Sequence, residues 1–384
     1  MAYFDILIER CGWLGVALMA LILTAFVWQT IFYLRNFGRI PGYRSSRRKS
    51  RLEAEPPVSV IVPLFSENIN YIENSLPLLL AQEHPQFQIV LVYVGCDSDF
   101  YADLLAHQSR YEKLTVTKIE SRFPISVKMA LNVGIKSARY EHVVLTTSDA
   151  VPATPHWLSM MAKGFTKAEI VLGYCGIEPG KGFARWTMRI SRMMNSALWI
   201  AAAIRRRPYR GIRHNMGFTK NIYFGSNGFN RLNMNIGEDD LYLQSIMRRN
   251  NVCVMVSPQA LVTEHPWGGL RWWADCVRHY GAATAYYPAR VRRYMCSEPL
   301  SRLLFFASCI AAAIILPAEF KYAAAGFWVL RYIIVTIVVR RMARRMGEQK
   351  IMGRYLVYDL LSPLCDMTMR IAMLRKDPSV SVWR

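Results

Sequence analysis

Acidic residues are scarce in this sequence, whose 384 residues include 27 Asp and Glu against 48 Lys and Arg, for a formal net charge of +21. Such an excess of positive charge indicates an anionic partner: nucleic acid, an acidic membrane surface or a phosphorylated ligand. Hydrophobic residues make up 53% of the chain, which favours the membrane. The basic residues flank apolar segments and form no groove with interleaved aromatic residues, so we expect no nucleic-acid partner.

Several motifs of common enzyme classes are also missing. The sequence has no GxGxxG after its first predicted strand and no GxxxxGK[ST], so it lacks the phosphate-binding loops of dinucleotide oxidoreductases and P-loop NTPases. It has no GxSxG nucleophile motif and no HExxH zinc motif. The eight Cys residues form no CxxC pair, and we interpret them as reduced thiols rather than as a disulfide framework.

The longest uncharged stretch lies near the N-terminus. Residues 11–34 carry no charge, and about 20 apolar residues suffice to span a bilayer as a helix. A cleavable signal peptide is the alternative, but the apolar run is too long and no small-residue cleavage site follows it. Lys and Arg dominate the next 17 residues, 35–51. By the positive-inside rule this flank lies in the cytoplasm and residues 1–10 lie outside.

Two further apolar stretches, residues 303–317 and 323–339, are separated by the short link AEFKY and followed by the basic run RRMARR. We expect a hairpin of two spans that enters and leaves on the cytoplasmic side, which gives three spans in total. A buried helical hairpin in a soluble domain is the alternative. Arg331 lies in the last span and must face another helix or reach an interface, because an isolated charge in lipid is costly.

Two more segments, residues 183–204 and 355–374, mix apolar residues with Arg. They suit helices that lie among anionic lipid head groups, although amphipathic helices packed in a core have the same pattern. The predicted organisation is an outer tail (1–10), a span (11–34), a basic linker (35–55), a cytoplasmic domain (56–290, with 183–204 as the interfacial helix), two spans (303–317 and 323–339) and a basic, amphipathic tail (340–384).

The cytoplasmic domain alternates strands with helices. Its predicted strands cover residues 58–65, 87–95, 114–120 and 142–150, and the first two are almost continuous apolar runs. This pattern indicates an α/β fold with a mostly parallel central sheet flanked by helices. Ligands of such sheets bind outside the carboxyl ends of the strands.

Acidic and polar residues occur where such a site is expected. Glu67 follows the first strand, and Asp149 stands at the end of the fourth. A third group, Glu238, Asp239 and Asp240, follows the glycine-rich stretch 224–230. We interpret these three loops as one site. Three acids that cap a helix are the alternative for the last group.

Four motifs in this order resemble the family 2 glycosyltransferases, particularly bacterial membrane-bound members. They are VSVIVPLFSEN (58–68), SVKMALNVGIKSARYEHVVLTTSDAVPATPHWL (126–158), GEDDLYL (237–243) and WWADCVRHY (272–280). The resemblance covers about residues 56–287. It implies the A-type nucleotide-sugar transferase fold.

The resemblance also implies roles for particular residues. Asp149 corresponds to the second Asp of a DxD motif, which would bind Mg²⁺ or Mn²⁺ on the diphosphate of a nucleotide-sugar. Asp239 would be the general base that deprotonates the acceptor hydroxyl, with a pKa raised by its acidic neighbours. Glu238 and Asp240 would orient Asp239 or cap the helix. The residues expected to contact the donor are Pro63, Glu67, Lys128, Ser148, Arg278 and His279.

The sequence departs from the family pattern in three places. The aspartates expected after the second strand are replaced by residues 93–95, where only Asp97 or Asp99 could substitute from a shifted position. The DxD motif is reduced to Thr147-Ser148-Asp149, and the QxxRW-type segment keeps Arg278 but lacks Gln and Trp. Each lost carboxylate should weaken binding of the nucleotide base or of the metal ion. His214 and His265 are interpreted as polar loop residues.

The predicted function is inverting transfer of a sugar from a nucleotide-diphosphate sugar to a membrane-associated acceptor, a glycolipid or a polyprenyl-linked glycan, in cell-envelope polysaccharide synthesis. The expected location is the bacterial inner membrane, with the catalytic domain on the cytoplasmic face and anionic lipids and pathway proteins as partners. A processive polysaccharide synthase is an alternative, but three spans are few for a channel. An inactive scaffold that partners an active transferase is another, because the DxD motif is incomplete.

Overall fold

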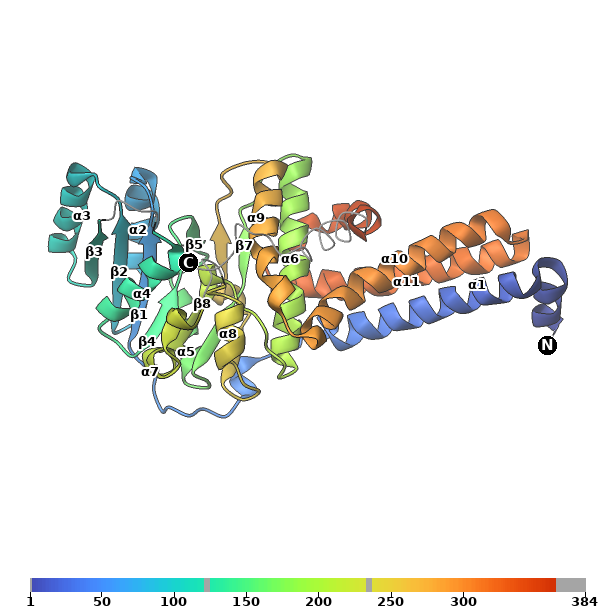
Figure 1. Ribbon diagram of the computed structural model, residues 1–384, viewed down its shortest axis with the longest axis horizontal. Helices are drawn as coiled ribbons and strands as arrows, with labels where there is room; N and C mark the ends of the chain where they lie inside the picture. Colours follow the sequence, from blue (N-terminus) through green and yellow to red (C-terminus); the bar gives the residue numbers. More distant parts are fainter. Residues whose placement is uncertain (1, 121–124, 233–236, 364–384) are drawn as a thin grey trace.

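The structure, a computed structural model, describes residues 2–120, 125–232 and 237–363. An α/β domain forms one end of the molecule, and a long arm of three helices projects from it (Figure 1). The arm consists of α1 (Ala2–Arg35), α10 (Ala289–Ile315) and α11 (Ala318–Arg345). Segments far apart in the sequence, α1 near the N-terminus and residues 289–345, therefore build the arm, and the domain lies between them in the sequence.

The domain is centred on a sheet of seven strands in the order β3-β2-β1-β4-β8-β6-β9. Every neighbouring pair is parallel except those of β8, which runs antiparallel to both β4 and β6. All seven residues of β1 are buried, as expected for a strand covered on both faces. The strands are β1 (Val58–Leu64), β2 (Phe87–Val94), β3 (Leu114–Ile119), β4 (His142–Leu145), β6 (Ile170–Gly173), β8 (Met216–Thr219) and β9 (Val252–Met255).

A second, small sheet lies beyond the end of β4. It has the order β5-β10-β7, with β5 (Ala150–Pro152), β7 (Cys175–Ile177) and β10 (Val262–Glu264). The antiparallel register pairs Glu264 with Ala150. This pairing brings Glu264 beside Asp149, although 115 positions of the chain separate them.

Helices connect and cover the strands, which confirms the predicted α/β fold with a mostly parallel sheet. Four of them begin with a side-chain cap, and in two of these Asp97 accepts from Phe100 N at 2.7 Å and Ser126 accepts from Met129 N at 3.4 Å. Such caps contribute about 1 kcal/mol each. The helices of the domain are α2 (Leu76–Leu80), α3 (Ser98–Arg110), α4 (Val127–Ser137), α5 (Trp157–Phe165), α6 (Phe183–Ile204), α7 (Lys220–Gly225), α8 (Leu241–Ile246) and α9 (Leu270–Ala282).

Helix α6 lies where the domain meets the arm (Figure 1). It has the bounds expected from the sequence, and most of its residues are buried between β7, β9 and α9. Its Arg189 Nη2 lies 2.5 Å from Oε2 of Glu348, which follows α11, and Tyr174 donates to the other oxygen of Glu348 at 3.2 Å. All three side chains are buried. Packing of this kind is that of a core helix, the second of the two alternatives for this segment.

Three helices of the described residues are long and apolar enough to cross a membrane: Gly12–Arg39, Ala289–Ile315 and Ala318–Arg345. One N-terminal and two C-terminal apolar helices were expected, and the last two extend beyond the apolar runs from which they were predicted. Helix α1 is kinked at Gly12, whose φ of 61° is accessible to glycine. Pro317 precedes α11 and separates it from α10.

Arg331 of α11 is fully buried among charged partners. Its Nη2 lies 3.0 Å from Oδ1 of Asp359, and its Nε donates to Gln29 of α1 at 2.6 Å. Asp359 belongs to a further helical stretch, residues 355–363. Arg302 of α10 also contacts Asp359 at 3.4 Å and pairs with Glu298 at 3.0 Å. The charge in the last span is therefore neutralised by facing other helices.

We expect Asp359→Ala to destabilise the protein by about 3–5 kcal/mol, because it leaves two buried arginines without a shared carboxylate. Thermal unfolding in detergent micelles, followed by circular dichroism, measures the effect. The double variant Arg331→Met/Asp359→Leu should recover most of the loss, since it removes both charges. If Asp359→Ala unfolded at the same temperature as the wild type, the ion pair of Arg331 and Asp359 would not stabilise the arm.

Candidate active site

Asp149 lies in the loop between β4 and β5, beyond the carboxyl end of a parallel strand. The hydroxyl of Thr147 donates to Oδ1 of Asp149, and the Asp149 carbonyl accepts from His265 N at 2.7 Å. Thr147 occupies the place of the first DxD carboxylate. Its hydroxyl therefore orients the remaining carboxylate instead of adding a second charge.

Two residues from other elements complete a cluster with Asp149. His214 Nε2 lies 3.9 Å from Asp149 Oδ1 and 3.7 Å from Glu264 Oε1. Two atoms that each lie about 2.1 Å from one divalent ion can be at most about 4.2 Å apart, so both spacings fit a shared ion. One carboxylate oxygen or ring nitrogen of each residue lies within 4.8 Å of the others. Asp149, His214 and Glu264 therefore form a candidate metal centre.

The electrostatics of this cluster also suit a cation. Burial, followed by the charges of Arg213 and Arg192, holds the pKa of His214 well below its usual range, so the ring is neutral and can coordinate through Nε2. Oε2 of Glu264 accepts from Arg192 Nη2 at 2.5 Å, and the other oxygen, Oε1, faces His214. One histidine and two carboxylates are suitable ligands for Mn²⁺.

The three acids of GEDD have separate surroundings, although they are adjacent in sequence. Glu238 pairs with Arg213 Nη1 at 2.9 Å. Asp240 caps α8 by accepting from Leu241 N, and it also accepts from the hydroxyl of Tyr287 at 2.6 Å. Capping thus accounts for Asp240 alone, and the other two acids require another explanation.

Asp239 is buried and lies between the other two acids and two arginines. Its Oδ2 is 3.9 Å from Arg210 Nη2, and it has no hydrogen-bond partner within the ranges that the structure describes. Its carbonyl accepts from Gly211 N at 2.8 Å. A buried carboxylate oxygen without a donor is available to accept a proton from a bound molecule.

The pKa of Asp239 is raised from 3.8 to about 6, and burial is the largest cause. Asp240 and Glu238 contribute to the rise, while the positive charges of Arg210 and Arg213 oppose it. The direction agrees with the expectation from the sequence, but loss of solvent contributes more than repulsion between the acids. The pKa of Asp240 is also raised, mainly by burial.

Four residues expected on the donor side lie near the carboxyl ends of β1 and β4 or on α4. Pro63 is buried within β1, and Ser148 is partly exposed beside Asp149. Lys128 of α4 donates to the carbonyl of Leu232 at 3.0 Å, and burial lowers its pKa against the opposing charge of Glu238. Lys128 is therefore close to the acid cluster.

Glu67 is exposed after β1 and accepts from the hydroxyl of Tyr93 at 2.7 Å. Tyr93 stands where the family pattern has an aspartate, so its hydroxyl holds Glu67 at the edge of the sheet. Asp97 is occupied in capping α3, and Asp99 lies exposed in the first turn of that helix.

The remaining two predicted residues lie on α9. Arg278 is exposed and paired with Asp275, so in this conformation it is not joined to the acid cluster. The side chain of His279 lies outside the described residues. The buried face of α9 instead presents Trp273 to Arg192, whose guanidinium carbon lies 5.2 Å from the ring centroid.

Sequence reasoning missed five residues that the structure brings to the site: Arg192, Arg210, Arg213, His214 and Glu264. The sequence contains one usable signal, the basic run RRRPYRGIRHN (205–215) directly before β8. Arg192 and Glu264 have no local signal, because each meets the other only through the packing of α6 on β10.

We expect His214→Ala and Glu264→Gln to weaken Mn²⁺ binding by more than about tenfold, because loss of even an outer-shell partner costs roughly 10–100-fold. Calorimetric titration of the metal-free protein measures this affinity. His156→Ala, which alters an exposed histidine paired with Glu83, is the matched control and should bind Mn²⁺ as the wild type does. Equal affinity in all three variants would exclude the cluster as the metal centre.

Comparisons with solved structures agree with this fold. A mannosyltransferase from Pyrobaculum calidifontis, in complex with GDP-Man and Mn²⁺, is 17% identical, with 91% of this chain and 98% of that chain covered and a TM-score of 0.53. At this identity the likeness shows the fold alone. TarS 1–349 from S. aureus, in complex with UDP-GlcNAc, is 14% identical over 78% of this chain and 91% of that chain, with a TM-score of 0.40.

The sequence itself was also compared with curated proteins and family models. No curated protein matches it. The model described as glycosyltransferase like family 2 matches residues 56–281, which is more than half of the chain and contains all ten predicted site residues. The chain therefore belongs to the family 2 glycosyltransferases, and it is an enzyme of that class.

Proposed function

We propose that the protein transfers a sugar from a nucleotide-diphosphate sugar to a hydroxyl of a membrane-associated acceptor, with inversion at the anomeric carbon. One observation carries the proposal: residues 210–214 join the candidate metal centre to Asp239. Within this segment His214 contacts Asp149 and Glu264, while Arg210 and Gly211 contact Asp239. A cation site and a carboxylate base are thus held side by side.

The cation site supplies the donor half of the reaction. A divalent ion bound there neutralises the charge that develops on the departing diphosphate. Asp149, His214 and Glu264 would hold it, and Lys128 brings a positive charge close to Glu238 of the acid cluster. Glu67, Pro63 and Ser148 are the candidates for contact with the nucleotide. Membership of the family 2 glycosyltransferases supports a nucleotide-sugar as the donor class.

Asp239 supplies the acceptor half. With a pKa of about 6 it is mostly ionised near neutral pH, and it remains basic enough to take a proton from a hydroxyl as the new bond forms. A single base acting directly on the acceptor requires no covalent intermediate, so the anomeric centre is inverted. Glu238 and Asp240 position Asp239, because each is fixed by its own partner.

The acceptor and the location follow from the helical arm. We infer a glycolipid or a polyprenyl-linked glycan as the acceptor and cell-envelope polysaccharide synthesis as the process. Three candidate spans support a multi-pass protein of a bacterial inner membrane. The basic flank after α1 supports a cytoplasmic catalytic domain, with anionic lipids and pathway proteins as neighbours.

A second candidate function, an inactive scaffold for another transferase, is favoured by one observation. Thr147 replaces a metal-binding carboxylate, and Tyr93 replaces an aspartate of the nucleotide site. His214 and Glu264 offset this argument, because they supply two ligands that the DxD motif does not contain. A transferase therefore accounts for more of the site than a scaffold does.

We expect Asp239→Asn to lower turnover by about 10²–10⁴-fold with little change in donor affinity, because general base catalysis contributes that much. Asp149→Ala should instead lose metal-dependent donor binding. Donor hydrolysis by the detergent-purified protein, across UDP-, GDP-, dTDP- and CMP-sugars with Mn²⁺ or Mg²⁺, and calorimetry measure the two effects. Asp103→Asn, which alters an exposed acid on α3, is the control. A folded protein that binds no nucleotide would favour the scaffold.

The pH dependence of activity should show an acidic limb near the pKa of Asp239. Because the ionised form acts as the base, turnover should rise as the pH increases through about 6. The folded protein binds this proton more tightly than the unfolded chain does, so stability falls as the pH rises from 3.8 to about 6, and the full loss remains above pH 6. Asp239→Asn should therefore lose the limb and unfold at a higher temperature than the wild type at pH 8. If the acidic limb persisted in Asp239→Asn, the limb would report the ionisation of another group.

A further inference from the structure

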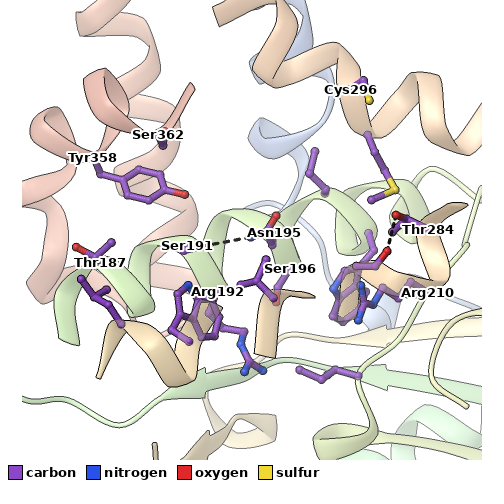
Figure 2. Close-up of a pocket in the computed structure, with 18 of the residues that line it drawn as sticks. Thr187, Ser191, Arg192, Asn195, Ser196, Arg210, Thr284, Cys296, Tyr358 and Ser362 are labelled. Atoms are coloured by element: carbon purple, nitrogen blue, oxygen red, sulfur yellow. Dashed lines mark hydrogen bonds between the residues drawn. The ribbon is translucent and has the colours of Figure 1, made fainter. Parts of the chain in front are cut away.

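A cavity of about 370 Å³ lies at the junction of the domain and the arm. Ligand pockets typically measure about 300–1,000 Å³, so it is large enough for part of a small molecule. Its walls come from α6, α9, the first turns of α10 and residues 355–363. Figure 2 shows α6 running through the site, with Arg192 and Arg210 toward the strands and Tyr358, Ser362 and Cys296 on the opposite side.

Most of the lining is apolar, as a hydrocarbon chain requires. Trp186, Leu198 and Trp199 contribute from α6, and Leu270 and Trp273 contribute from α9. Phe183, also in the lining, is 53% exposed, and Leu270 is 42% exposed. Large apolar side chains that stay exposed around a cavity mark a surface that is covered by lipid or another apolar partner.

The charged side chains of the lining all have one sign. Three arginines, Arg192, Arg210 and Arg292, line the cavity, and no carboxylate is among the lining residues that the structure describes. An apolar space with positive charge at its walls is complementary to an amphiphile that has a negatively charged head group.

The arginines on the side of the strands connect the cavity to the candidate active site. Arg210 lies 3.9 Å from Asp239, and Gly211, also in the lining, donates to the Asp239 carbonyl at 2.8 Å. Arg192 pairs with Glu264 of the candidate metal centre. A head group in this part of the cavity would therefore lie next to the proposed base.

The opposite side of the cavity connects to the candidate membrane spans. Arg292, Met295 and Cys296 belong to the first turns of α10, one of the three helices able to cross a bilayer. Continuity from a span to the base is the arrangement that a lipid-borne acceptor needs, since its chain stays in an apolar environment while its head group reaches the site.

We propose that this cavity holds the chain of the acceptor, an anionic lipid, and directs its head group past Arg210 to Asp239. This assignment rests on the proposed transferase function. It narrows the acceptor to a lipid that bears a phosphate or similar anion and whose hydrocarbon chain fits between α6, α9 and residues 355–363.

Photo-crosslinking tests the proposal on the full chain in nanodiscs. The probe is hexadecyl phosphate with a diazirine in its chain, which has the chain and the charge but no acceptor hydroxyl. We expect the label on residues of α6, α9 and 355–363. Asn195→Trp, which enlarges an exposed side chain of the lining, should reduce labelling by about tenfold, the effect of overfilling a packed site. Ala102→Trp on α3, at the opposite end of the molecule from the arm (Figure 1), should label as the wild type does.

Charge and catalysis provide two further readouts. Arg292→Gln should weaken competition by unlabelled hexadecyl phosphate by up to about fivefold and leave competition by hexadecanol unchanged. Bound hexadecyl phosphate should also slow donor hydrolysis without altering donor affinity, because it excludes water beside Asp239.

The outcomes separate this proposal from the one on which it rests. Labelling outside the cavity, or equal labelling of Asn195→Trp and wild type, would overturn the lipid site. Labelling in the cavity with unchanged donor hydrolysis would identify a structural membrane lipid and overturn the assignment to the acceptor. Failure of the wild type to bind any nucleotide-sugar would overturn the transferase function, and the acceptor assignment with it, while the position of the label still reported where the lipid binds.

Discussion

The buried ion pair between Arg192 and Glu264 is the interaction on which the rest of this site depends. Removing either partner would leave a charge without compensation in the interior, which is strongly destabilising. The pair fixes α6 against β10 and leaves the second oxygen of Glu264 directed at His214. One turn earlier on the same helix, Arg189 binds Glu348 at the end of α11. A single helix thus carries one arginine for the candidate metal centre and one for the arm.

The acid cluster, Glu238, Asp239 and Asp240, shows that adjacent carboxylates can have different roles. Adjacent carboxylates would repel one another if all were equally placed, yet each is directed to a different partner. Glu238 and Asp240 accept from strong donors, whereas Oδ2 of Asp239 has no donor among the residues that the structure describes. The base is therefore selected by what surrounds each residue. The excess of positive charge in the chain serves the same purpose, because arginines from residues 210–213 stabilise acids that burial would otherwise keep protonated.

The sequence was sufficient for the fold, since β1 and β2 are almost continuous apolar runs and such a pattern depends only on the local sequence. It also located Asp149, because strand ends in parallel sheets adjoin ligands. It did not reveal Glu264, which reaches Asp149 only through the register of β10 on β5. Arg278 was assigned from its motif, but motif position does not determine which face of α9 a side chain occupies, and here that face is exposed. Contacts between residues far apart in the sequence leave no local pattern. The sequence therefore predicts the position of Asp149, but not the approach of Glu264 or the exposed face of Arg278.

The partnership of Arg331 with Asp359 has a consequence for biosynthesis. The chain is made from its N-terminus, so α11 is synthesised before residue 359, and the cation of this candidate span lacks its carboxylate until the following helical stretch has been made. The hairpin of α10 and α11 can settle at its final depth only once the following helical stretch has emerged and docked. Docking of residues 355–363 is therefore the last step in the assembly of the arm, and it also forms the last wall of the cavity beside the site.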